Sequence, residues 1–205
     1  LGIEAAGKEL GVKTRFLGPT GYDIPAMIDT IEQAIVQKPA GIEIIGFVEE
    51  LAPVINKALD AGIPVVTLDA DTATSNRYTF IGTGNYGAGQ MSARLLAEQI
   101  DGSGKVAVTS VVGQTNLEER TQGFKDYMAE NHPGVELVQV IDHKSDMNQA
   151  ISGVKAVMQA HPDLKGVAAV EATGGAGAAT AVKEMGKVGQ VKIVSMDRDD
   201  TTLKM

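Results

Sequence analysis

The feature that most constrains the fold of this 205-residue chain is a regular alternation of short apolar runs with segments of helical periodicity. Residues 63–68 (IPVVTL) are apolar without alternation, which is typical of a parallel strand covered by helices on both faces. Residues 23–37 carry apolar side chains every three or four positions, and Asp23 with Pro25 marks a helix start. Within these 205 residues, the first strand is expected at residues 12–17 (VKTRFL). The alternation predicts a doubly wound α/β fold.

The alternation breaks once, where the polar loop DADTATSN connects IPVVTL to the next strand without a helix. A helix is expected at residues 86–100, and the alternation then resumes. A single break predicts two Rossmann-like lobes with parallel sheets, residues 1–83 and 84–205, joined by a hinge. The segments IPVVTLDADT and VKIVSMDRDDT both place Asp-x-Asp directly after an apolar strand, which also favours two similar lobes.

Composition and charge exclude several classes of partner. The formal charge of −8, without any cluster of Lys and Arg, argues against binding to nucleic acid. No apolar run approaches the ~20 residues needed to cross a bilayer, so direct membrane insertion is not expected. The absence of cysteine removes disulfides, thiolate metal sites and cysteine nucleophiles.

The segment GTGNYG matches the G-x-G-x-x-G pattern of dinucleotide-binding enzymes. A nicotinamide site also needs an acidic residue after the next strand, and KVAVTSVVG contains none. We therefore favour a hinge over a cofactor loop, with glycines that allow φ values other residues avoid. The predicted hinge residues are Gly82, Thr83, Gly84 and Asn85.

Other catalytic and metal signatures are incomplete. DGSGKV lacks parts of a phosphate-binding loop, and no G-x-S-x-G motif occurs. His132, His143 and His161 match no zinc spacing and are expected to face solvent. We predict no catalytic residue, no metal site and no cofactor.

Ligands of open α/β sheets bind outside the carboxyl ends of the strands, where this chain places several polar side chains. These are Asp69, Asp71, Gln114, Asn116, Glu171, Asp197 and Asp199, with Arg120 one helical turn after Asn116. Carboxylates, an amide and a guanidinium suit a polyhydroxyl ligand such as a sugar. The alternative for each acid is capping of the next turn or helix, and Arg120 could pair with acids on its own helix.

The chain resembles the type I periplasmic solute-binding proteins of the ribose-, galactose- and autoinducer-2-binding kind. The resemblance rests on the order and spacing of AGIPVVTLDADT, RYTFIGTGNYGAGQ, NLEERTQGF, AHPDLKGVAAV, AVKEMGK and VKIVSMD. It implies that Asp69, Asn116, Arg120, Glu171 and Asp197 contact a sugar, and that the first hinge crossing lies at Thr83 to Asn85. Glu171 stands where the family has an amide. Phe47 is the best candidate for a stacking platform, since the chain has no Trp.

The resemblance further implies how such a protein works. A sugar or polyol bridges the two lobes, and the closed monomer docks on the permease of an ABC transporter. The protein would be periplasmic, or extracellular and lipid-anchored, with a first strand before Leu1 and closing segments after Met205. The alternatives are the ligand-binding core of a lac-repressor-family regulator and a NAD-dependent or nucleotide-sugar enzyme. A pentose, a hexose and a polyol all remain open as the ligand.

Overall fold

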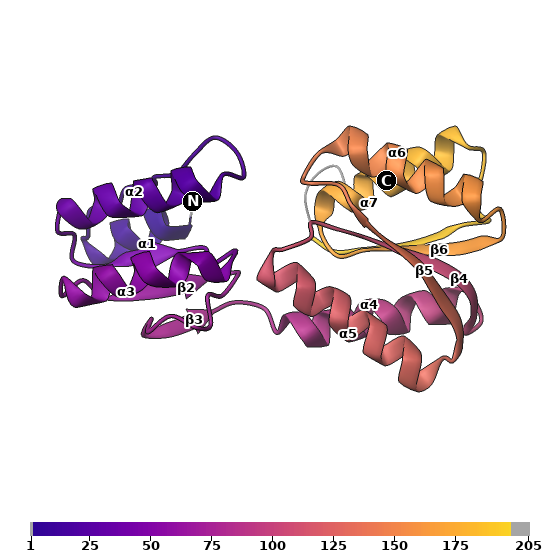
Figure 1. The fold of residues 1–205 in the computed structure, drawn as a ribbon, viewed down its shortest axis with the longest axis horizontal. Helices are drawn as coiled ribbons and strands as arrows, with labels where there is room; N and C mark the ends of the chain where they lie inside the picture. Colours follow the sequence, from indigo (N-terminus) through magenta and orange to yellow (C-terminus); the bar gives the residue numbers. More distant parts are fainter. Residues whose placement is uncertain (1, 198–205) are drawn as a thin grey trace.

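The computed structural model of the chain describes residues 2–197, which form two bodies built on separate parallel sheets (Figure 1). The sheet of the first lobe has the order β1-β2-β3, with β1 (Ile42–Ile44), β2 (Val65–Leu68) and β3 (Thr79–Ile81). The sheet of the second lobe has the order β5-β4-β6-β7, with β4 (Ser103–Ser110), β5 (Gly134–Asp142), β6 (Leu164–Ala169) and β7 (Lys192–Ser195). All strand pairs in both sheets are parallel. The predicted two-lobe α/β fold is confirmed.

The helices of the first lobe are α1 (Gly2–Leu10), α2 (Ile24–Val36) and α3 (Ala52–Asp60), with a 3₁₀ turn, η1 (Glu49–Leu51), before α3. The side chain of Asp23 accepts a hydrogen bond from the N–H of Ala26 at 3.0 Å, which confirms the predicted start of α2. The apolar stripe of α2 packs with α3, β1 and β2 in one core cluster.

The prediction of a strand at residues 12–17 is wrong. These residues have no regular secondary structure, and the side chain of Phe16 is 83% exposed. A strand is held by backbone hydrogen bonds to a neighbour, and no strand within residues 2–197 pairs with this segment. Local β-propensity alone does not supply that partner.

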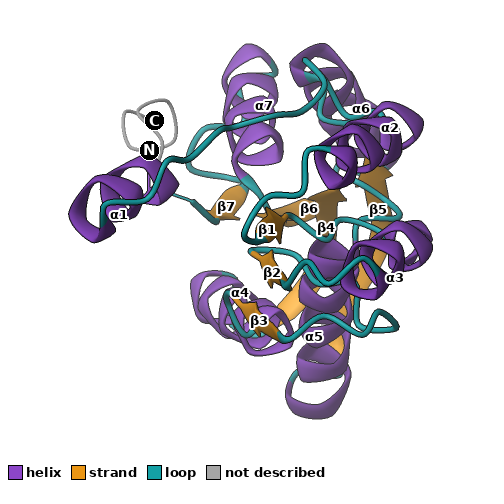
Figure 2. Ribbon diagram, turned by 90° about the vertical axis from the view of Figure 1, so that its left-hand side faces the viewer, coloured by secondary structure: helices purple, strands orange, loops and turns teal. Residues whose placement is uncertain are grey.

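The second lobe has helices on both faces of its sheet (Figure 2). One face carries α4 (Asn85–Gln99) and α5 (Thr115–Asn131), and the other carries α6 (Met147–Ala160) and α7 (Ala172–Glu184). Val106 and Val108 of β4 pack towards α4 and α5, while Ala107 packs towards α6 and α7, and all three are fully buried. Burial on both faces explains why these strands are apolar without alternation.

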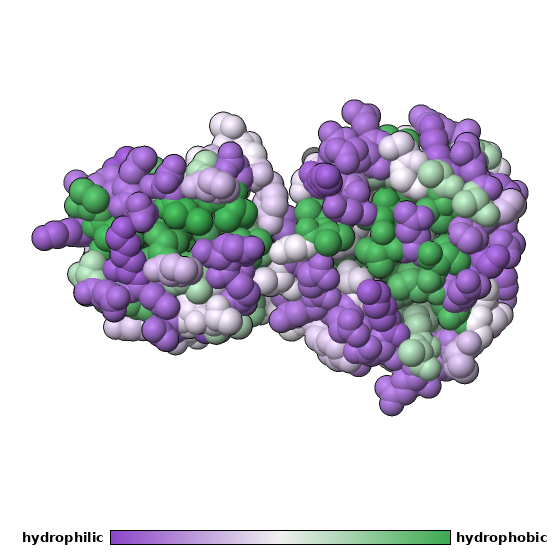
Figure 3. Space-filling model, in the orientation of Figure 1, coloured by the Kyte–Doolittle hydropathy of each residue, from purple (hydrophilic) through white to green (hydrophobic). Residues whose placement is uncertain are grey.

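The chain crosses between the lobes after β3, where the molecule narrows (Figures 1 and 3). The crossing lies at residues 82–84, between Ile81 at the end of β3 and Asn85 at the start of α4. We expected these glycines to adopt φ values that other residues avoid. Neither Gly82 nor Gly84 has a positive φ, so the backbone here is not left-handed. The hinge function and the lobe boundary at residues 83 and 84 stay predictions.

Candidate functional site

A cavity of about 160 Å³ lies where the two lobes meet, at the carboxyl ends of their strands. Its lining comes from the loops after β1, β2, β4, β5, β6 and β7 and from the first turns of α5. The lining residues are Phe47, Asp69, Val111, Gln114, Asn116, Leu117, Arg120, Ser145, Glu171 and Asp197. Seven of the nine candidate residues named in the sequence analysis therefore surround one cavity, all except Asp71 and Asp199, and their contact with a ligand stays a prediction. Asp199, from the same strand-end set, lies outside the described residues.

Asp69 and Asp197 enter the cavity from opposite lobes with the same unusual backbone conformation. Their φ angles are 63° and 73°, in the left-handed region that Asp tolerates better than most residues. Asp69 directly follows β2, and its N–H donates to the carbonyl of Ile81 in β3 at 3.0 Å. The sequence similarity between IPVVTLDADT and VKIVSMDRDDT therefore corresponds to a shared turn of the chain at the strand end.

Arg120 is buried rather than paired with acids on a solvated face of α5. Its Nε donates to the side-chain oxygen of Asn85 at 2.9 Å, and its Nη1 donates to the carbonyl of Val170 at 2.8 Å. Asn85, predicted as part of the hinge, is thus a buried residue of the first turn of α4 that orients the guanidinium. These two bonds leave Nη2 of Arg120 available to a ligand in the cavity.

Asn116 lies one turn before Arg120 on α5 and also lines the cavity. Its side chain is buried, and its Oδ1 has no hydrogen-bond partner within residues 2–197. An unpaired buried acceptor costs about 1–3 kcal/mol. A hydroxyl donor in the cavity would offset that cost.

Glu171 caps helix α7 with the side chain that the sequence assigns to the ligand. Its carboxylate accepts hydrogen bonds from the N–H groups of Thr173 at 2.8 Å and Gly174 at 2.5 Å. Nε2 of His143 lies 2.9 Å from Oε1 of Glu171. Burial alone would raise the pKa of Glu171, but the contacts with His143 and the two backbone amides outweigh it, so that this pKa lies below its ordinary value. Glu171 thus caps a helix and also lines the cavity, while its contact with a ligand stays a prediction.

His143 is fully buried, so the prediction that it faces solvent is wrong. It follows β5 directly, and its N–H donates to the carbonyl of Ser110 at the end of β4, which draws the residue into the lobe. The imidazole lies beside Glu171, whose carboxylate lines the cavity. The spacing of the histidines in the sequence does not predict that His143 lies beside Glu171.

We expect replacement of Glu171 by glutamine to lower the free energy of unfolding by about 1 kcal/mol at pH 7, because the charged cap is lost. Since the folded pKa of Glu171 lies below its ordinary 4.5, the ionised carboxylate stabilises the fold above about pH 4.5. That contribution is lost as the pH falls through the folded pKa. The difference between wild type and E171Q in urea unfolding should therefore shrink towards pH 3.

The control for this prediction is D23N, in which asparagine caps α2 as well as aspartate does. D23N should unfold like the wild type at pH 7. An E171Q deficit of the same size at pH 7 and pH 3 would show that charge is not its source.

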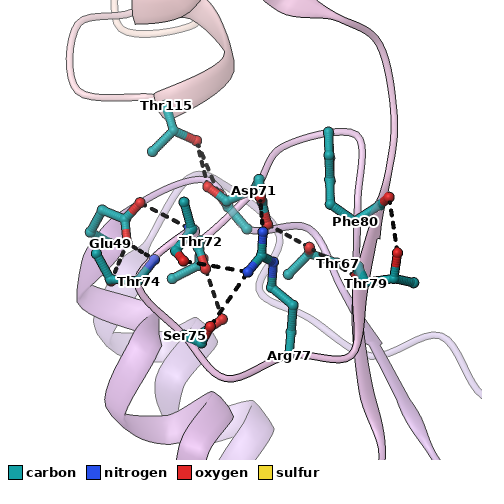
Figure 4. A network of polar contacts seen from close by, with 12 residues as sticks. Glu49, Thr67, Asp71, Thr72, Thr74, Ser75, Arg77, Thr79, Phe80 and Thr115 are labelled. Carbon is teal, nitrogen blue, oxygen red and sulfur yellow. Dashed lines mark hydrogen bonds and ion pairs between the residues drawn. The ribbon is translucent and has the colours of Figure 1, made fainter.

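Asp71 is absent from the cavity lining, so its contact with the ligand stays a prediction that the cavity does not support. Its carboxylate accepts a hydrogen bond from the hydroxyl of Thr67 at 2.7 Å and forms an ion pair with Arg77 (Figure 4). The chain turns between Asp69 and Asp71, so the two side chains serve different surroundings. Asp71 shapes the loop between β2 and β3.

Ser145 is a lining residue that the sequence analysis missed. It lies in the loop after β5, and both it and Lys144 have positive φ angles, of 59° and 50°. The rule that polar residues follow the carboxyl ends of strands would have found Ser145 had it been applied to β5. Val111 and Leu117 also line the cavity but carry no chemical signal in the sequence.

The motif GTGNYG contributes no residue to the cavity lining. Gly82 and Gly84 precede α4, and Gly87 lies within its first turns. Within residues 2–197, no three His, Asp or Glu side chains come together as a set that could hold a metal ion. None of the helices in that range combines the length and apolarity needed to span a membrane.

The sequence has relatives among sugar-binding proteins. The D-ribose/D-allose-binding protein of Pseudomonas aeruginosa is 31% identical over 186 residues, which cover 85% of this chain and 57% of that protein. The ribose import binding protein RbsB of Bacillus subtilis is 24% identical over 98% of this chain and 65% of its own length. The chain thus spans less than two thirds of these relatives.

Solved structures of sugar-binding proteins share the fold. The glucose-galactose binding protein GanP from Geobacillus stearothermophilus superimposes with a TM-score of 0.94 and 32% identity, over 99% of this chain and 73% of that one. The sugar-binding protein of a sugar ABC transporter from Bacillus halodurans has a TM-score of 0.90 and 39% identity, over 99% of this chain and 70% of its own. The family described as periplasmic binding protein domain matches residues 1–205. The chain therefore belongs to the periplasmic binding protein domain family.

Proposed function

We propose that the protein binds an uncharged small sugar or polyol between its lobes, without catalysis, and delivers it to the permease of an ABC transporter. The observation that carries this proposal is the cavity itself. Phe47 and Asp69 of the first lobe face Asn116, Arg120 and other polar residues of the second lobe across it.

The chemistry of the lining suits a ligand rich in hydroxyl groups. Each hydroxyl both donates and accepts hydrogen bonds. The carboxylates can accept a hydrogen bond from a sugar hydroxyl, while Arg120 and the amide of Asn116 can donate one to its oxygen. Phe47 adds an apolar surface, and the edge contact of its ring with Tyr22, at a centroid distance of 5.8 Å, fixes its orientation. A volume of about 160 Å³ lies below the roughly 300–1,000 Å³ of pockets for drug-sized ligands, which suits a monosaccharide.

The charge balance argues against an anionic ligand. Three carboxylates, those of Asp69, Glu171 and Asp197, line the cavity together with one guanidinium. A sugar phosphate would bring further negative charge into this field, at a cost that low dielectric increases. Neutral sugars are therefore the class of ligand we propose.

The family supports the role in transport, since its relatives include sugar import binding proteins. We propose that residues 1–83 and 84–205 act as the two lobes, that the crossing at Gly82 to Asn85 absorbs the closing rotation, and that the protein works as a monomer in the periplasm or, lipid-anchored, outside the cell. An apolar leader before residue 1 would fit this role. A basic helix-turn-helix there would fit the lac-repressor-type alternative.

Titration calorimetry with D-ribose, D-allose, D-xylose, D-arabinose, D-galactose and D-glucose tests the proposal. We expect micromolar binding of at least one of them and no binding of D-ribose 5-phosphate. D69N should weaken that binding at least about ten-fold, because a charged acceptor is lost. The matched control is D101N, which removes the same charge from an exposed left-handed aspartate outside the cavity.

Two outcomes would contradict the proposal. In one, no sugar binds and thermal stabilisation is seen with NAD, or with UDP and manganese, which would indicate an enzyme. In the other, D69N binds the sugar as tightly as D101N does, which would remove Asp69 from the site.

A further inference from the structure

Thr115 is the first residue of α5 and lies between Gln114 and Asn116, two residues that line the cavity. Thr115 itself is half-buried and does not line the cavity. Any effect of Thr115 on the site therefore comes from its contacts with other parts of the protein.

The polar atoms of Thr115 reach across to the first lobe. Its N–H donates to the carbonyl of Phe47 at 2.9 Å. Its hydroxyl lies 3.0 Å from the carbonyl oxygen of Asp71 and 3.1 Å from that of Gly46, so the single hydroxyl proton is shared between them (Figure 4). In the part of the chain that the structure describes, all the hydrogen bonds that join residues 2–81 to residues 85–197 come from Thr115.

The acceptors belong to two loops that are tied together. The N–H of Gly46, in the loop after β1, donates to the carbonyl of Ala70, in the loop after β2, at 2.9 Å. A Cβ on Gly46 would lie 2.5 Å from the backbone nitrogen of Thr72, so only glycine allows this approach. The two loops therefore present their carbonyls to Thr115 as one surface.

Side chains brace the second of these loops. The contacts of Asp71 with Thr67 and Arg77 hold its start, and the carboxylate of Glu49 accepts hydrogen bonds from the N–H groups of Ala73 at 3.0 Å and Thr74 at 3.1 Å (Figure 4). These contacts within the first lobe hold the carbonyl of Asp71 in position without any contribution from α5. Asp71 is thus part of this brace.

We propose that Thr115 is a positioning residue that latches the two lobes together over the ligand. It bonds to the loops that carry Phe47 and Asp69, and its own neighbours in the chain are Gln114 and Asn116. Forming these bonds brings both halves of the cavity lining to their places. This inference rests on the proposed function, because the latch gives ligand binding its dependence on closure.

The test compares T115V, which removes the hydroxyl at nearly constant shape, with T115S, which keeps it. T30V is the matched control, since the hydroxyl of Thr30 donates to Ala26 of its own helix, α2. Because the chain has no cysteine, spin labels can be placed at the exposed positions Asp60 and Gln99, one in each lobe. Pulsed electron resonance then reports the distance between the lobes, and stopped-flow mixing with D-ribose and D-galactose reports the dissociation rate.

We expect T115V to shift the lobes of the ligand-free protein towards wider separation by about five-fold in population, and to speed sugar dissociation by a similar factor. T115S and T30V should stay within two-fold of the wild type. An unchanged distance distribution together with an unchanged dissociation rate in T115V would overturn the latch. If neither sugar binds the wild type, the distance distribution of the ligand-free protein alone decides about the latch, while the sugar panel decides about the proposed function.

Discussion

Replacement of Arg120 by methionine should weaken sugar binding by about 100-fold, the largest loss that we expect from a single change in the cavity. The guanidinium is buried and is the positive group of a lining whose other charged groups are carboxylates. One or two charge-assisted hydrogen bonds of about 1.5–3 kcal/mol each would be lost, while methionine keeps the apolar stem. Calorimetry with the best sugar of the panel measures the change.

The same substitution should also destabilise the second lobe, because it leaves the side-chain oxygen of Asn85 and the carbonyl of Val170 without their donors. We expect a loss of about 2 kcal/mol in urea unfolding. R120K should fall between R120M and the wild type, since an ammonium group cannot reproduce the planar fork of the guanidinium.

R94M is the control, since Arg94 is half-exposed on α4. Its Nε lies 3.9 Å from Oε1 of Glu98, which makes a weak, exposed ion pair. It should change neither affinity nor stability measurably. If R120M unfolds earlier but binds sugar within two-fold of the wild type, Arg120 is structural and does not contact the ligand.

Replacement of Gly89 by alanine should lower the free energy of unfolding by about 3 kcal/mol or more. A Cβ at this position would lie 1.9 Å from the carbonyl oxygen of Arg120, so helices α4 and α5 would have to move apart. The contact is with backbone, which cannot rotate away as a side chain could. Gly123 shows the reciprocal contact, with its Cβ position 2.1 Å from the carbonyl oxygen of Tyr86.

Gly87 gives the matched control in the same helix. A Cβ there meets no atom within 4 Å, so G87A should stabilise the protein by about 0.5–1 kcal/mol through helix propensity. Urea unfolding should therefore give opposite signs for the two variants. G89A should also weaken sugar binding, because the displaced backbone carries Arg120. A G89A protein as stable as the wild type would show that α4 and α5 can part without cost.

The positions of the cavity residues follow from a property that the sequence shows directly. Parallel strands end at the same edge of a sheet, so polar residues directly after them meet in space. Asp69, Asn116, Glu171 and Asp197 were predicted in this way, and the cavity brings them together. The start of α2 at Asp23 was predictable for a similar reason, since a cap depends on residues within one turn.

The errors concern residues whose surroundings come from distant parts of the chain. Residues 12–17 have the composition of a strand, but a strand needs a hydrogen-bonded neighbour that composition does not specify. His143 is buried because β4 and α7 meet around it.

The sequence by itself determined the α/β class, the division into two lobes and the strand ends at which a ligand would lie, because periodicity and strand-end polarity act over a few residues. Only the tertiary structure decided what each polar side chain does there. The contact of Glu171 with His143, the burial of Arg120 against Asn85 and the reach of Thr115 to Gly46 join residues that lie 28, 35 and 69 positions apart in the chain. Such contacts are fixed by packing of whole elements, which no local pattern encodes.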